Sequence, residues 1–327
     1  MCILIAMSWL FILVSTLAWG IAEIFYKKGN LEKERYSHLK TTVFVGFFMG
    51  VYALVILFTQ GVDLKLFPKN FLIYLPVALC YIVSMVCSYF GVRFIEESIS
   101  DPIENSSCAI VAILSALILH ETYEIPAIVS IVIIVIGLVA VSLFDKNGKD
   151  IRHKKFGKKL AIFAIAMPFC YMLLDAAGTF LDIFYTDDVT TTLLVGVTEE
   201  TIEHTANCAY ELTFFLVSIG ILVFLKIKKV KLLDFGENSQ ENKGFFCKII
   251  DQKWKILAAV FETIGQATYL FALSDGGAVA AVLLGAGTVI TSLILSRLFL
   301  KEKLTWIQYV FVGIIMCGII MGAIFGL

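Results

Sequence analysis

The chain has 327 residues, of which 59% are hydrophobic and only 16% are charged, and its mean hydropathy is +0.90. One soluble domain cannot bury so much apolar surface, so the composition indicates that the chain resides in a lipid bilayer. This excludes a soluble enzyme, a disordered scaffold and a nucleic-acid-binding protein. The formal net charge of −1 is uninformative, whereas the positions of the charges along the chain are informative.

Ten apolar segments are long enough to cross a bilayer, since a spanning helix needs about 20 mostly apolar residues. No Lys or Arg precedes the first segment and no clean cleavage site follows it, so it is expected to be a retained helix and not a secretory signal. Segments eight and nine nearly touch, and the Gly-rich turn between them predicts a hairpin of two helices. The fold class is therefore all-α integral membrane. The predicted spans are residues 7–26, 41–60, 70–93, 100–120, 125–144, 159–184, 206–225, 255–274, 277–297 and 305–325.

The basic residues collect in the loops that follow the odd-numbered spans. These loops hold 24 of the 26 Lys and Arg residues, and only Lys65 and Lys69 follow the second span. The positive-inside rule then predicts that the odd-numbered loops are cytoplasmic and that both termini lie outside. The compact loops and the lack of a targeting sequence favour a bacterial plasma membrane. In the long loop after the sixth span, residues 191–198 are expected to form a short interfacial helix or a lid.

The ten spans divide into two copies of five. An offset of 181 residues places Glu121 opposite Glu302, each in a short charged turn between two apolar helices. Because five is an odd number, the second copy enters from the other side of the membrane, which predicts inverted-topology repeats with a site at their interface near the midplane. An alignment of the first and sixth spans pairs Trp19 with Tyr171 and Glu23 with Asp175.

Three stretches carry a family resemblance: AWGIAEIFYKKG in the first span, the hairpin SALILHETYEIPAIVSIVIIVIGLVAV, and SLILSRLFLKEKLTWIQYVFVGIIMCGII near the C-terminus. On these motifs the chain resembles the drug/metabolite transporter superfamily, specifically the EamA type of ten-helix carrier, over nearly its whole length. The resemblance implies a central cavity lined by spans 1, 3, 4, 6, 8 and 9, with spans 5 and 10 peripheral. The expected organisation is a first five-helix repeat at residues 1–145, a basic cytoplasmic linker at 146–158 and a second repeat at 159–327.

Several acidic residues fall inside the predicted spans, and no Lys or Arg lies comparably deep. An ionisable side chain in hydrocarbon costs at least ~2.5–3.5 kcal/mol, so it usually faces a cavity and has a function. The cavity is therefore expected to be electronegative. Individual acids have simpler explanations, because Glu23 can pair with Lys27 four residues on, and Glu104 lies where an acid favours the helix dipole. The intramembrane acids are Glu23, Glu104, Asp175, Glu211 and Glu262.

Aromatic side chains accompany these acids on the same spans. An aromatic face beside a carboxylate suits an ammonium or a quaternary amine, although most single aromatics of this kind only pack or face lipid. Glu262, Asp175 and Glu23 are also the candidates for binding a coupling proton, since burial favours the protonated carboxyl. The candidate substrate-binding residues are Trp19, Glu23, Tyr81, Tyr89, Glu104, Asn105, Tyr171, Asp175 and Glu262.

The sequence thus predicts a secondary active transporter that moves a small cationic or zwitterionic metabolite, such as an amine, a choline-like compound or an amino acid, by alternating access. Without a Walker A motif, the driving force would be a proton gradient or the substrate's own gradient. The alternatives are a carrier of an anionic metabolite such as a nucleotide-sugar or sugar phosphate, which would need buried Lys or Arg, and a channel. We expect no catalytic residues, no cofactor and no metal site. The expected partners are a small-molecule substrate and the bilayer, with no nucleic acid, in a monomer or homodimer.

Overall fold

The structure is a computed structural model that describes residues 2–143, 158–186, 189–233, 245–302 and 305–325, and all regular secondary structure in these ranges is helical. By length and composition, eight helical segments can cross a membrane, and two shorter apolar helices, Ile125–Ala140 and Trp306–Met321, bring the set to ten. These ten segments coincide with the ten predicted spans. The predicted linker at 146–158 lies, apart from Lys158, outside the described residues.

The helices follow one another as α1 (Cys2–Gly29), α2 (Ser37–Thr59), α3 (Phe67–Gly91), α4 (Glu97–Glu104), α5 (Ser107–Leu114), the π-helix η1 (Ser115–Leu119), α6 (Ile125–Leu143), α8 (Lys158–Thr186), α9 (Ile202–Ile227), α10 (Phe245–Asp251), α11 (Lys253–Leu295), the π-helix η2 (Ser296–Leu300) and α12 (Trp306–Phe325).

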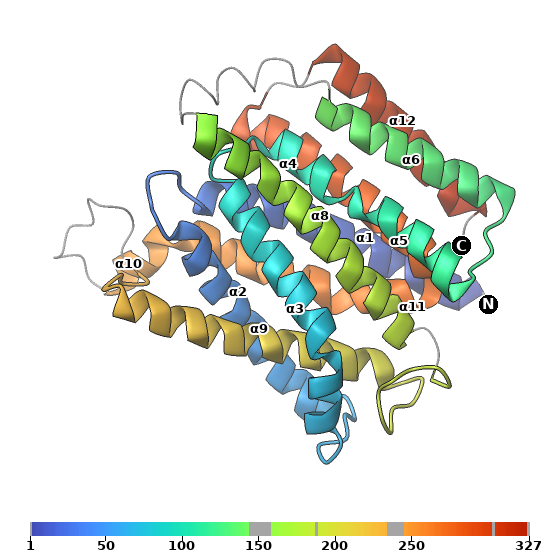
Figure 1. The fold of residues 1–327 in the computed structure, drawn as a ribbon, viewed down its shortest axis with the longest axis horizontal. Helices are drawn as coiled ribbons and strands as arrows, with labels where there is room; N and C mark the ends of the chain where they lie inside the picture. The colour runs from blue at the N-terminus through green and yellow to red at the C-terminus, as the bar shows by residue number, and fades with distance from the viewer. Residues whose placement is uncertain (1, 144–157, 187–188, 234–244, 303–304, 326–327) are drawn as a thin grey trace.

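The fifth and tenth spans, α6 and α12, pack against each other at the periphery. Figure 1 shows them together along one edge of the bundle, with α2 and α9 toward the opposite edge. A Cβ atom built on Gly137 of α6 would lie 2.4 Å from the Ile315 side chain of α12, so only glycine permits this approach. Ser130 of α6 also donates a hydrogen bond to the carbonyl of Gly318 at 3.0 Å. The two helices therefore cover each other and leave the centre of the bundle to the remaining spans.

The eighth and ninth spans form the two limbs of α11. The chain turns at Gly277, whose φ of 50° and ψ of −138° interrupt the helix and lie in a region that glycine adopts without strain. Both limbs then pass the same turn of α1, because Trp19 packs on Gly265 of the first limb and Gly20 on Thr291 of the second. Since these two contacts are nearly equidistant from Gly277 in sequence, α11 is a hairpin, as the Gly-rich turn predicts.

The fourth span is broken, which the sequence did not predict. It begins at Glu97, so Pro102 lies inside α4 and not at the start of the span, and Asn105 and Ser106 separate α4 from α5. The early start has a local cause. Oε1 of Glu302 accepts the backbone N–H of Glu97 at 3.1 Å, and Oε2 accepts that of Ser98 at 3.0 Å, so donors that a helix start leaves unpaired are satisfied.

The 181-residue offset of the repeat is visible in the backbone. Each copy ends its fourth helix in a π-turn followed by one left-handed residue, His120 (φ 57°) in the first and Lys301 (φ 59°) in the second. The next residues, Glu121 and Glu302, each lie at the start of a helix in the other repeat. Glu302 lies at the start of α4. Glu121 lies beside Gly277, and a Cβ atom built on Gly277 would be 3.4 Å from a carboxyl oxygen of Glu121. A carboxylate at a helix N-terminus is favourable because the macrodipole is positive there.

Replacing Glu302 with alanine is expected to destabilise the protein by about 1 kcal/mol, the usual effect of losing an N-terminal cap. The variant loses both hydrogen bonds to α4 and the carboxylate charge near its first turn. Thermal unfolding in detergent micelles measures the change. Glu199→Ala, which removes an exposed acid, is the control, and equal melting temperatures for the two variants would show that the cap contributes no stability.

The loop after α8 contains no helix in its described part, so of the two expectations for residues 191–198 the helix is wrong, and the lid stays a prediction. The segment forms turns and is fastened to the start of α3 by Asn70. The side-chain amide of Asn70 donates to the Val195 carbonyl at 3.0 Å, and its oxygen accepts the Val195 N–H at 2.8 Å. Because one amide satisfies both backbone groups, the segment does not need helical hydrogen bonds at this point.

Candidate functional site

A cavity with about 830 Å³ of atom-free space, partly open to solvent, lies among the central helices. Its lining comes from α1, α3, α4, α5, α8, α11 and one residue of α9, and includes Asn105 between α4 and α5; among the described residues, α2, α6 and α12 contribute none. Four lining side chains carry carboxyl groups and seven are aromatic, and no described lining residue is Lys, Arg or His. The cavity is therefore acidic and aromatic.

Three helices present their lining residues at helical spacing, so each set falls on one face of its helix. The sets are Trp19, Glu23 and Tyr26 in α1; Tyr171, Asp175 and Thr179 in α8; and Glu262, Gln266 and Tyr269 in α11.

The structure brings all nine predicted substrate-binding residues to this one cavity. That they bind substrate remains a prediction. They are Trp19, Glu23, Tyr81, Tyr89, Glu104, Asn105, Tyr171, Asp175 and Glu262.

Glu262 has the most complete set of partners among the four acids. Its Oε1 accepts the indole N–H of Trp19 at 3.1 Å and its Oε2 accepts the hydroxyl of Tyr26 at 2.8 Å. Tyr89 donates in turn to the Tyr26 hydroxyl at 2.9 Å, and the centroids of these two rings lie 4.4 Å apart. Neutral donors thus hold the carboxyl group in place without neutralising its charge, and aromatic rings surround it. This arrangement can receive an organic cation.

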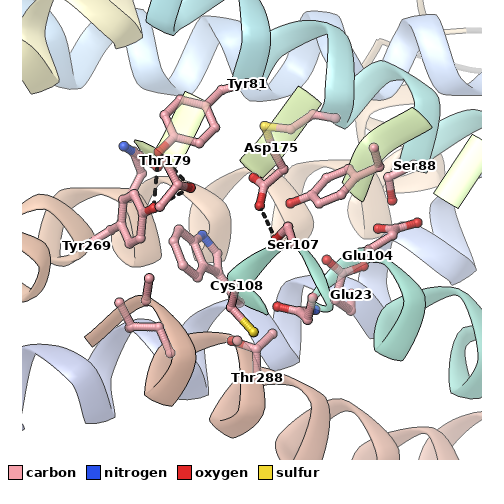
Figure 2. Close-up of a pocket in the computed structure, with 18 of the residues that line it drawn as sticks. Glu23, Tyr81, Ser88, Glu104, Ser107, Cys108, Asp175, Thr179, Tyr269 and Thr288 are labelled. Carbon is pink, nitrogen blue, oxygen red and sulfur yellow. Dashed lines mark hydrogen bonds between the residues drawn. The ribbon is translucent and has the colours of Figure 1, made fainter. Parts of the chain in front are cut away.

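The other three acids differ in how they are held. Ser107, at the start of α5, donates to Oδ2 of Asp175 at 2.6 Å, as Figure 2 shows. Ser100 donates to Oε1 of Glu104 at 2.7 Å. Oε2 of Glu23 is buried and has no hydrogen-bond partner among the described residues. Lys27, the alternative partner of Glu23, donates to the carbonyls of Val92 and Ile95.

A second polar group beside the cavity was missed in the sequence. Asp182 is fully buried and accepts hydrogen bonds from Tyr74 and, at 3.1 Å, from Tyr81. The hydroxyls of Tyr81 and Tyr269 lie 3.1 Å apart and both contact Thr179. Asp182 follows Asp175 by seven residues, which is two helical turns, so helical spacing alone could have revealed it.

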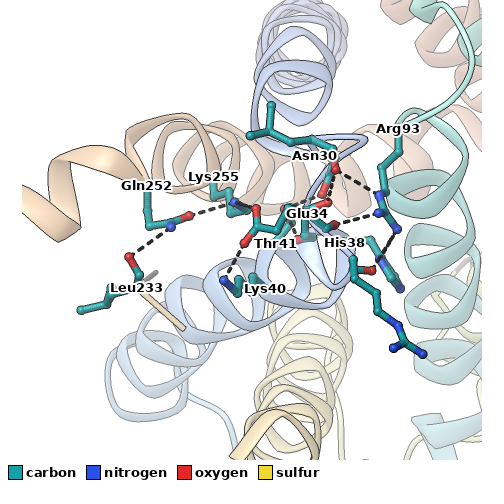
Figure 3. Close-up of polar contacts among 12 residues, drawn as sticks. Asn30, Glu34, His38, Lys40, Thr41, Arg93, Leu233, Gln252 and Lys255 are labelled. Carbon is teal, nitrogen blue, oxygen red and sulfur yellow. Dashed lines mark hydrogen bonds and ion pairs between the residues drawn. The ribbon is translucent and has the colours of Figure 1, made fainter. Parts of the chain in front are cut away.

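The end of the bundle where α1 meets α2 is closed by buried charges (Figure 3). We call it the basic end. Glu34 pairs there with Lys40 at 2.5 Å and with Lys255 at 3.1 Å, and all three side chains are nearly inaccessible. The guanidinium of Arg93 donates to four backbone carbonyls of residues 31–35, which fixes this connection against the end of α3.

Ten apolar helices around an electronegative cavity define an integral membrane protein of the transporter class. The sequence profile of the EamA-like transporter family matches residues 6–143 and, a second time, residues 190–323. The chain therefore belongs to the EamA-like transporter family, and with it to the drug/metabolite transporter superfamily. The two matches confirm the predicted architecture of ten transmembrane helices in two inverted five-helix repeats.

A solved structure described as "Crystal structure of protein" is similar over 94% of this chain and 97% of its own, with a TM-score of 0.59 and 12% sequence identity. At this identity the likeness concerns the fold alone. No curated protein matches the chain.

Proposed function

We propose that the protein is a secondary active transporter for a small organic cation or zwitterion, such as an amine, a choline-like compound or an amino acid. The observation that carries this proposal is the cavity lining, in which four carboxyl groups and seven aromatic rings meet no described basic side chain. An anionic metabolite would place its charge against these carboxyl groups in a medium of low dielectric, where repulsion is strong. A cation is attracted both by the carboxylates and by the faces of the aromatic rings.

Glu262, Asp175 and Glu23 are the proposed proton-coupling residues. Each lines the cavity and lies within a membrane-spanning helix. A carboxyl group that accepts a proton no longer attracts a cation, so proton and substrate would alternate at the same place as the two repeats rock about it. In this proposal the basic end faces the cytoplasm and both termini lie outside, in a bacterial plasma membrane, and the carrier acts as a monomer or homodimer.

A thermal-shift screen tests the substrate class. Purified protein is heated with amines, quaternary amines, amino acids and nucleotide-sugars. A bound cation present at 100 times its Kd stabilises the folded state by about 2.7 kcal/mol. The expected result is that one cationic class stabilises the wild type and fails to stabilise Asp175→Asn, which keeps the side-chain shape.

The exposed Glu124 provides the control, since Glu124→Gln should respond to ligands as the wild type does. Stabilisation by nucleotide-sugars alone would overturn the proposal and favour a carrier of anionic metabolites.

A further inference from the structure

Glu211 in α9 is a buried acid that the proposed transport cycle does not use. Its side chain is 0% exposed, and within the described part of the chain neither carboxyl oxygen has a hydrogen-bond partner. It does not line the cavity, although Tyr210 beside it does. A polar group in such surroundings is costly unless something satisfies it, so its retention in the middle of an apolar helix requires an explanation.

The burial of Glu211 follows from the close contact of α9 with α2. A Cβ on Gly46 would lie 2.7 Å from the carbonyl oxygen of Phe214, and one on Gly50 would lie 2.6 Å from the ring of Phe215. The thiol of Cys208 donates to the carbonyl of Ala53 at 3.4 Å. Two small residues in α2 thus let the helix backbones approach, and the face of α9 around Glu211 is sealed from solvent.

Among the residues that the structure describes, no positive charge faces Glu211 from the packed helices. The nearby titratable groups are Tyr52 from α2, Cys208 and Tyr210 from α9, Tyr81 from α3 behind Tyr210, and Glu262 from α11 on the far side of Tyr210. None of these is a cation. An ionised carboxylate would therefore lack both a counter-charge and a hydrogen-bond donor, and the only chemical species that removes its charge without needing space is a proton.

Two polar side chains lie between this acid and the cavity. Asn207 precedes Glu211 by one helical turn on the same face of α9, and its side-chain oxygen accepts from Nε2 of Gln266 at 3.4 Å. Gln266 lines the cavity and follows Glu262 by one turn of α11. The order Glu211, Asn207, Gln266, Glu262 thus leads from the α2–α9 interface to the candidate substrate site.

We propose that Glu211 is a proton-binding site outside the substrate cavity, with the polar side chains of Asn207 and Gln266 between the two. In the structure described here a proton occupies one carboxyl oxygen, and it is released as H⁺ when α2 and α9 separate and water reaches the group. Because the site lies apart from the cavity, it can hold a proton whether the cavity acids carry protons or a substrate. The role in coupling rests on the proposed function; the proton site itself does not.

Infrared spectroscopy of the protein in lipid vesicles tests the site without a substrate. At neutral pH the wild type should show the C=O stretching band of a protonated carboxylic acid that is absent from Glu211→Gln and retained in Glu199→Gln, which changes an exposed acid. Glu211→Asp should shift this band and not abolish it, which assigns the band even if the glutamine variant fails to fold. Identical spectra for wild type, Glu211→Gln and Glu211→Asp would overturn the proposal.

The pH dependence of stability gives a second readout. A carboxyl that is protonated when folded and ionised when unfolded releases a proton on unfolding, so the wild type should lose stability relative to Glu211→Gln as pH rises above about 4.3, the usual value for an exposed glutamate. The two melting temperatures should converge below that pH. A difference that does not change with pH would contradict a bound proton.

Transport measurements distinguish a failure of the proposed function from a failure of the proposed role of Glu211. A cation that stabilises the wild type should stabilise Glu211→Gln equally, while its proton-driven accumulation in vesicles is lost in the variant. If no cation binds the wild type, the proposed function fails and the infrared result still decides the proton site. If accumulation by Glu211→Gln equals that of the wild type, the coupling role of Glu211 is overturned.

Discussion

Replacing Glu262 with glutamine is expected to abolish proton-driven accumulation of the transported cation and to weaken its binding by roughly 30-fold or more. Removing one partner of a buried, hydrogen-bonded charge pair typically costs about 2–5 kcal/mol, and a tenfold change in affinity corresponds to about 1.4 kcal/mol. The glutamine has nearly the shape of the glutamate and keeps one carbonyl oxygen as an acceptor for Trp19 or Tyr26, while its amide nitrogen replaces the other acceptor. Uptake into vesicles and thermal shift measure the two effects.

Tyr26→Phe is the matched control for this result. It removes one hydrogen bond to Glu262 and leaves the carboxyl group in place, so proton-driven accumulation should persist, with binding weakened by at most about 1.5–3 kcal/mol, the contribution of one hydrogen bond to a charged partner. Undiminished accumulation in Glu262→Gln would exclude this residue as the coupling site and leave Asp175, Glu23 and Glu211 as the candidates.

Glu34→Ala is expected to destabilise the protein by about 3–5 kcal/mol, the usual cost of breaking a buried ion pair by removing one partner. The substitution leaves the ammonium groups of Lys40 and Lys255 buried without this carboxylate. Chemical unfolding in detergent measures the loss. The neighbouring Lys33 is exposed, so Lys33→Ala should change stability by less than about 0.5 kcal/mol. A loss no larger than in Lys33→Ala would show that the basic end does not depend on these ion pairs.

Much of the fold was predictable because membrane insertion depends on a local property. A run of apolar residues long enough to span the bilayer identifies a helix wherever it occurs, and the ten predicted spans lie on the ten apolar segments of the structure. The acids that line the cavity were predictable for the same reason, since Asp175 or Glu262 stands out within an apolar run.

Residues near the span ends were harder to assign. Tyr26 directly precedes Lys27 and Lys28, and it was not predicted although it donates to Glu262. Asp182 lies shortly before the acidic loop that begins at Asp187, and it was not predicted although it accepts from Tyr81 in the cavity wall. Near a boundary, composition alone does not show whether the helix continues.

Contacts between distant residues were not predictable from local patterns. The start of α4 at Glu97 depends on Glu302, 205 residues later, whereas the sequence predicted that the span begins at residue 100. The same limit applies to the loop after α8, whose conformation depends on Asn70, 125 residues earlier. In each case a side chain from another part of the chain satisfies the backbone and overrides the local preference.

The pairing of α1 with α11 has a consequence for biosynthesis. Ser15 bonds with Gly265 and Thr268, which are 250 and 253 residues away, and both limbs of α11 pass the same turn of α1. Because a chain is made from its N-terminus, Ser15 of α1 must wait until α11 has been made before these hydrogen bonds can form. During synthesis α1 therefore remains without its partner helix until α11 has been inserted. Variants that slow the insertion of α11 should prolong this stage and be degraded by quality-control proteases to a greater extent than the wild type.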